Sequence, residues 1–181
     1  MRQLVKEILY RIRGEYTTEK LIKLGLSVGN NFKRLHGVIL DPSHCWLITI
    51  GDNVTMAPRV HVLAHDASTC FFLGYAKIGR VNIGSNAFIG ADSVILPNVT
   101  IGDNVIVGAN SIVTKNLNEN SVYAGNPAKY ICSFDEFSKK HRDNRESHTV
   151  FREYEWDKWI DSSEEEKENM YNKLKKTHGY L

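Results

Sequence analysis

An apolar residue recurs at every sixth position along much of this 181-residue chain. The clearest members of the series are Ile50, Met56, Val62, Ile83, Ile89, Ile95, Ile101, Val107 and Val113. Upstream, the same frame is continued less regularly by Leu26, Phe32, Val38 and His44. The fifth residue of each unit is mostly small or β-branched, and the second is often glycine. A period of six fits neither the 3.6-residue turn of an α-helix nor the two-residue alternation of a strand.

A six-residue unit has the length of one short strand followed by a tight corner. Glycine and asparagine suit such a corner because they tolerate a positive φ. Three units close a triangular coil of about 18 residues, and successive coils stack at roughly the strand spacing of 4.8 Å. Each repeated residue then points inward, and its burial contributes on the order of 2 kcal/mol as an upper value. We therefore predict an all-β core, a parallel β-helix over residues 26–131.

An antiparallel sandwich with regularly spaced turns is the alternative architecture. Its turns come about every 8–12 residues, which does not match a period of six. The period leaves the handedness of the helix open, because most parallel crossover connections are right-handed.

The frame is interrupted between Val62 and Ile83. These residues are 21 positions apart, whereas one coil accounts for about 18. We therefore expect about three residues beyond a coil to bulge outward. His65 lies where the frame breaks, and loops on a rigid scaffold carry function disproportionately.

The two flanks of the repeat region have a different pattern. Residues 1–25 are expected to form an N-terminal helical cap. Residues 3–13 place apolar side chains at helical spacing. Thr17 or Thr18 is expected to cap a second short helix, which runs to Lys23 and ends before Gly25. Residues 132–181 are expected to form a charged C-terminal helical extension. There Ser163 and Glu166 have the spacing of a capping box, which predicts a helix from about Glu164 to Lys176.

Composition excludes several classes of protein. The formal net charge is +2, which gives no argument for nucleic acid or an anionic membrane as a partner. No apolar run is long enough to span a bilayer, and charges interrupt the first residues, so we predict no signal peptide. Three widely spaced cysteines are read as reduced thiols, which favours a cytoplasmic protein.

Two stretches of the repeat region resemble one family. The segment ITIGDNVTMAPRVHVLAHD (48–66) resembles the catalytic coil of the maltose and galactoside O-acetyltransferases, and residues 83–131 resemble their second half. The segment HDASTCFFLGYAKIGRV (65–81) is more similar to acetyltransferases of bacterial surface polysaccharide synthesis. The resemblance implies a left-handed β-helix, acetyl-coenzyme A (acetyl-CoA) as the acyl donor, and a homotrimer with active sites between neighbouring subunits.

His65 is the candidate catalytic residue. Acetyl transfer to a hydroxyl needs a base within hydrogen-bond reach, and the imidazole pKa lies near neutrality. Of the seven histidines, His65 is at the frame break, and it matches the position of the family's catalytic histidine. Asp66 could orient its ring, but a carboxylate from elsewhere or a backbone carbonyl could do so instead.

The resemblance also suggests the residues that bind acetyl-CoA. Ala91 and Ala109, each third in its unit, are one coil apart and match positions that contact the pantetheine arm. Thr114, Lys115 and Lys129 match positions that contact phosphate, as expected for cations facing an anion. The chain departs from the family at Phe88, where tryptophan is common, and at Cys132, where an arginine is common.

The acceptor side gives fewer signals. Asp41 and Asn31 are candidates for binding a sugar hydroxyl, although asparagine is also a common corner residue. No metal is expected, because the His61-x-x-x-His65 spacing does not converge on a β-coil. Direct transfer in a ternary complex is preferred to a covalent acyl-cysteine. The expected activity is O-acetylation of a sugar or polysaccharide precursor; the alternatives are N-acetylation of an amino-sugar nucleotide and a non-catalytic structural β-helix.

Overall fold

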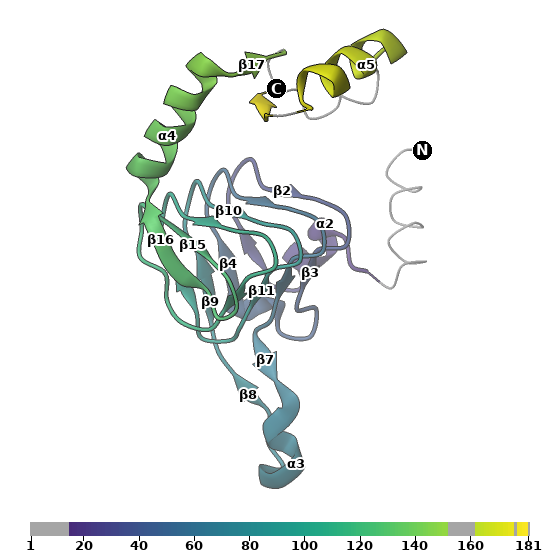
Figure 1. The fold of residues 1–181 in the computed structure, drawn as a ribbon. Helices are drawn as coiled ribbons and strands as arrows, with labels where there is room; N and C mark the ends of the chain where they lie inside the picture. Colours follow the sequence, from purple (N-terminus) through teal and green to yellow (C-terminus); the bar gives the residue numbers. More distant parts are fainter. Residues whose placement is uncertain (1–14, 152–161, 176, 181) are drawn as a thin grey trace. The chain divides into compact units, whose positions relative to one another are not determined.

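The computed structural model describes residues 15–151, 162–175 and 177–180. The chain divides into two compact units, Met1–Phe134 and Asp135–Leu181. Most of the first unit is a coil of short parallel strands that form three sheets (Figure 1). Among the described residues, no helix has the length and apolar character required for a membrane span.

Each sheet of the β-helix takes one strand from each coil. The first sheet contains β1 (Ser27–Val28), β4 (Ile48–Ile50), β9 (Val81–Ile83) and β12 (Thr100–Ile101). The second contains β2 (Lys33–Arg34), β5 (Thr55–Met56), β10 (Phe88–Ile89), β13 (Ile106–Val107), β15 (Ser121–Ala124) and the antiparallel β16 (Lys129–Ser133). The third contains β3 (Ile39–Leu40), β6 (His61–Val62), β11 (Val94–Ile95) and β14 (Ile112–Val113). The corners after these sheets are here called the first, second and third corner.

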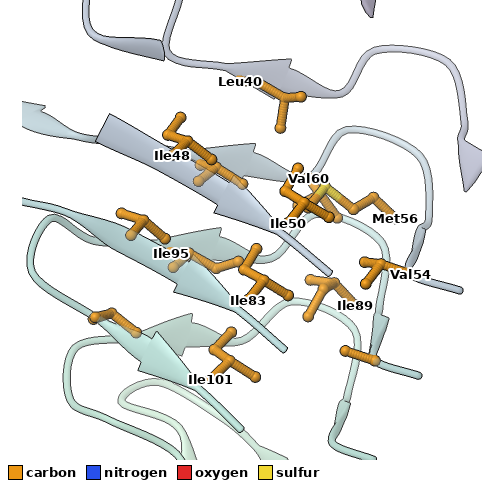
Figure 2. Close-up of a cluster of buried hydrophobic side chains, with 14 of the residues drawn as sticks. Leu40, Ile48, Ile50, Val54, Met56, Val60, Ile83, Ile89, Ile95 and Ile101 are labelled. Carbon is orange, nitrogen blue, oxygen red and sulfur yellow. The ribbon is translucent and has the colours of Figure 1, made fainter. Parts of the chain in front are cut away.

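The repeated residues fill the interior of the coil, as the period predicts. Ile50 is in register with Ile83, Met56 with Ile89, and Val62 with Ile95. These side chains and the residues two positions before them are at most 2% exposed. Figure 2 shows Ile50, Met56, Ile83, Ile89 and Ile95 packed between the strands. The predicted core of residues 50–62 and 83–113 is therefore confirmed.

Asparagine side chains form a ladder along the first corner. Each member has a positive φ between 55° and 57°. Four hydrogen bonds of 2.8–3.1 Å run from the side-chain amide of one member to the side-chain oxygen of the next. The members are Asn31, Asn53, Asn86, Asn104 and Asn120. Asparagine tolerates this backbone better than most residues, so one residue type meets both the conformational and the hydrogen-bonding demands of the corner.

The predicted frame upstream of Ile50 is wrong by two residues. Val28, and not Leu26, is in register with Ile50, while Arg34 and Leu40 occupy the next two inward positions. Leu26 and Val38 are still buried, because both the first and the fifth residue of a unit face inward. Apolar spacing alone does not distinguish these two registers, and a charged residue at position 34 obscures the correct one.

The expected bulge of about three residues is also wrong. Val62 is in the third sheet and Ile83 in the first sheet of the next coil, so the connection is a single six-residue step with 15 additional residues. The inserted chain forms an arm of β7 (His65–Asp66), 3₁₀ helix η2 (Ala67–Thr69), α3 (Cys70–Leu73) and β8 (Lys77–Ile78). Figure 1 shows this arm projecting away from the stacked coils.

A short helix precedes the first coil. It is α2 (Thr18–Lys23), and the Thr17 side chain accepts a hydrogen bond from the Lys20 amide. Leu21 of this helix belongs to the core, and Gly25 follows with a φ of +108°. The predicted cap and stop are confirmed, whereas the helix expected over residues 3–13 lies outside the described residues.

The second unit contains α4 (Phe134–Ser147), which begins at the boundary, α5 (Glu164–Lys173) and the parallel pair β17 (Thr149–Val150) and β18 (Gly179–Tyr180). Ser163 and Glu166 form the predicted capping box in both directions.

Candidate functional site

His65 is located at the third corner, where the arm leaves the coil. His65 is the first residue of β7, and its imidazole is half-buried. One coil earlier, Asp41 follows β3 at the same corner, and its backbone amide donates to the Val62 carbonyl of the neighbouring strand. The stacking of two coils therefore brings together two residues that are 24 positions apart.

The carboxylate of Asp41 is held close to the imidazole of His65. Asp41 Oδ2 is 2.6 Å from His65 Nδ1, and the Asp41 side chain is 1% exposed. The same oxygen accepts the Ala64 amide at 2.9 Å, and Oδ1 accepts the Ser43 hydroxyl at 2.7 Å. Burial alone works to raise the pKa of the Asp41 carboxyl, but hydrogen bonds from His65, Ser43 and Ala64 outweigh it, and the pKa is lowered.

An ionised Asp41 fixes the tautomer of His65. A carboxylate only accepts hydrogen bonds, so Nδ1 carries the proton and Nε2 keeps its lone pair. This is the form that a general base requires. The sequence assigned Asp41 to acceptor binding. In the structure both of its carboxylate oxygens accept hydrogen bonds from protein donors, and Oδ2 contacts the His65 ring.

Asp66 does not hold the His65 ring. Its side chain accepts the Ser68 amide at 2.9 Å and caps η2. Of the three orienting groups considered from the sequence, the structure therefore supplies the carboxylate from elsewhere in the chain.

A cavity of about 430 Å³ lies beside His65 at the third corner. It is lined by residues of the coil and the arm: Leu63, His65, Asp66, Ala67, Lys77, Leu96, Pro97 and Thr114. Thr114 was predicted from the sequence as a cofactor contact, and the structure brings it to the same cavity as His65. Lys77 was not predicted. It reaches the cavity because β8 pairs with β7, which sets Lys77 opposite Asp66.

Comparison with known proteins places the chain in a family. Residues 80–115 match the model of the bacterial transferase hexapeptide, six repeats. The chain is 39% identical over 175 residues to Protein CapG of Staphylococcus aureus, an alignment that covers 92% of this chain and 99% of CapG. The chain belongs to the hexapeptide-repeat acetyltransferase family. The prediction of a left-handed parallel β-helix with helical flanks is thereby confirmed.

Two solved members of this family have a similar fold. A maltose O-acetyltransferase from Clostridium difficile 630 is 37% identical, with a TM-score of 0.54, and the match covers 60% of this chain and 59% of that one. A hexapeptide-repeat acetyltransferase from Vibrio cholerae O1 biovar eltor, complexed with acetyl-CoA, is 26% identical, with a TM-score of 0.53 and 60% of each chain covered. The chain therefore spans about three fifths of the length of these solved relatives.

The residues that the sequence suggested for acetyl-CoA lie at two places on the β-helix. Ala91 and Ala109 follow the second sheet, one coil apart, and the Asn110 amide donates to the Ala91 carbonyl at 2.7 Å. Thr114 and Lys115 follow the third sheet, and the exposed Lys129 begins β16. A single chain therefore brings Thr114, but not the alanines, to the corner of His65.

Asn31 belongs to the asparagine ladder of the first corner, away from the corner of His65. Its side-chain amide donates to Asn53, which accounts for this residue as part of the fold. The structure does not bring Asn31 together with His65 within one chain.

Two residues beside His65 were missed at the sequence level. Ser43 Oγ is 3.4 Å from His65 Nδ1, and the His44 ring lies 4.9 Å from the His65 ring between centroids. Both residues lie between Leu40 and Ile50, two successive inward positions of the coil. These are ten positions apart, whereas the repeat places such residues six apart, so this corner contains four additional residues. These additional residues lie at the same corner as the arm, and their presence was the sequence signal that could have pointed to Ser43 and His44.

The buried cysteine is unsuited to carry an acyl group. Cys45 is fully buried in 3₁₀ helix η1 (Cys45–Leu47), and burial raises the pKa of its thiol. A raised pKa lowers the fraction of thiolate, which is the nucleophilic form.

Proposed function

We propose that this protein transfers an acetyl group from acetyl-CoA to a hydroxyl of a sugar or polysaccharide precursor, with His65 as general base. The observation that carries the proposal is the 2.6 Å contact between the buried Asp41 carboxylate and His65 Nδ1, at the edge of a cavity. The family supports the chemistry: one solved relative is a maltose O-acetyltransferase and another was solved with acetyl-CoA.

His65 moves one proton in the proposed reaction. The acceptor hydroxyl donates a hydrogen bond to Nε2, and its oxygen forms a bond with the acetyl carbon of the thioester as the proton passes to Nε2. The resulting imidazolium is paired with the Asp41 carboxylate, which stabilises the charge. When the carbon–sulfur bond breaks, the departing thiolate takes that proton, so His65 returns to its starting form.

The binding of acetyl-CoA is assigned to two surfaces. The small side chains of Ala91 and Ala109 leave room for the pantetheine arm along the second corner. Lys115 and Lys129 are assigned to the far end, where their ammonium groups face the phosphates. Thr114, which lines the cavity beside His65, is assigned to acetyl-CoA as well.

We further propose that the active protein is a homotrimer. The interior of one coil is filled by the repeated aliphatic side chains, and the proposed site residues lie at two corners of the same chain, so a complete site needs a neighbour. The arm also ends in exposed aromatic side chains: Phe71 is 96% exposed and Phe72 is 71% exposed in the single chain. Large exposed apolar groups of this kind mark interfaces.

The test is a panel of sugars, amino sugars and sugar nucleotides incubated with acetyl-CoA and the full-length protein. Release of the free thiol reports turnover, and mass spectrometry of the product locates an O- or N-linked acetyl group. Acetylation of a sugar hydroxyl is expected. Transfer to amines alone would replace O-acetylation by N-acetylation, and no acceptor-dependent thiol release across the panel would contradict the proposal.

A further inference from the structure

We propose that His44 and His65, supported by Asp41, form a binding site for Zn²⁺, and that zinc bound there reversibly inhibits acetyl transfer. The inhibitory part rests on the proposed role of His65, whereas zinc binding is independent of it. Among the described residues, these three each offer a donor atom, and the atoms lie within 4.8 Å of one another.

The hydrogen bonds around the cluster prepare both imidazoles as ligands. The Ser43 hydroxyl donates to Asp41 Oδ1 at 2.7 Å, so its oxygen accepts from His44 Nδ1, which lies 3.0 Å away. His65 Nδ1 is directed in the same way at Asp41 Oδ2. Each ring then has its proton on Nδ1 and its lone pair on Nε2, the neutral form in which histidine binds metals.

Asp41 holds the His65 ligand in place rather than binding the ion, because its Oδ2 lies on His65 Nδ1, on the other side of the ring from Nε2. A metal-binding histidine usually donates its other ring nitrogen to a carboxylate, which fixes the ring and increases its basicity. Two imidazoles with an adjacent buried carboxylate favour Zn²⁺ over Mg²⁺ or Ca²⁺, which prefer sites built from oxygen. Water is expected to fill the remaining coordination positions.

Zinc at this position prevents the proposed proton transfer. The Nε2 lone pair of His65 cannot accept a proton from the acceptor hydroxyl while it is bound to a metal ion. Inhibition is therefore expected to rise with zinc occupancy, and a chelator is expected to restore the rate.

The experiment measures zinc binding to the full-length, chelator-treated protein by isothermal titration calorimetry with ZnCl₂. We compare the wild type with H44N, which removes one proposed ligand, and with H61N, a matched control on neighbouring β6 outside the cluster. A third variant, H178N, reports zinc held by the stacked His148 and His178 of the second unit. H44N is expected to weaken binding at least about tenfold, while H61N and H178N retain one high-affinity ion per chain.

Zinc inhibition is then measured for each variant relative to its own zinc-free rate. The inhibition midpoint of H44N is expected to rise at least about tenfold, and that of H61N to stay unchanged. Equal zinc affinity in H44N and the wild type, or loss of binding only in H178N, would overturn the site. If the protein binds zinc as described but transfers no acetyl group, the proposed function fails while the metal site stands.

Discussion

Replacing Asp41 with asparagine tests how His65 is held. The substitution keeps the shape of the side chain but replaces a charged carboxylate by a neutral amide. The carboxylate oxygens accept hydrogen bonds from His65, Ser43 and Ala64. The amide nitrogen can now donate to His65 Nδ1, which moves the ring proton to Nε2 and leaves the base in the wrong tautomer. We expect kcat to fall by about 10²–10⁴-fold, the range typical of general-base catalysis.

The same substitution has a smaller expected effect on the fold. Hydrogen bonds to a charged group contribute about 1.5–3 kcal/mol, and an asparagine retains part of that, so we expect a loss of about 1–3 kcal/mol in the free energy of unfolding. The pKa of Asp41 is lowered in the folded state. Its contribution to stability is therefore present above the ordinary value of 3.8 and is lost as the pH falls through the folded pKa.

The assays are steady-state thiol release and urea unfolding followed by circular dichroism, for D41N and for D66N as a matched control. Asp66 is exposed and caps η2 without holding His65, so D66N is expected to keep its kcat. Wild-type kcat in D41N, with its fold intact, would refute the reasoning that Asp41 orients the base.

Three further predictions concern the donor site and the assembly. A109W is expected to abolish acetyl-CoA binding in calorimetry while the circular dichroism spectrum stays unchanged, because Ala109 is exposed and contributes little to the core; normal binding would place the pantetheine arm elsewhere. K115A is expected to raise the KM for acetyl-CoA with little change in kcat, since it removes a contact to a phosphate; an unchanged KM would remove Lys115 from the site. Light scattering at micromolar concentration is expected to give the mass of a trimer, and an active monomer would contradict the proposed assembly.

The sequence predicted the parts of the structure that depend on local repetition. Burial of the same frame position in every coil produces a six-residue period, so residues 50–62 and 83–113 were placed correctly. The Thr17 cap and the Ser163–Glu166 capping box are local hydrogen-bonding patterns, and both were predicted from residues close together in the chain. His65 was singled out as a candidate because it lies where the period breaks and because it matches the position of the family's catalytic histidine.

The rest depends on how the coils stack. The register upstream of Ile50 is ambiguous in sequence because two positions in every unit face inward. The length of the arm was underestimated because the 21 residues from Val62 to Ile83 resemble one coil plus a bulge, whereas the chain crosses only one corner. The role of Asp41 depends on a contact across 24 positions, which no local pattern encodes.

The turnover number of H65A tests the central claim most directly. Its kcat is compared with that of the wild type and of H61A, in which a histidine outside the Asp41–His65 pair is removed, with circular dichroism as the check on folding. The account predicts a decrease of about 10²–10⁴-fold in H65A and little change in H61A. A folded H65A that turns over at nearly the wild-type rate would contradict the assignment of His65 as the general base.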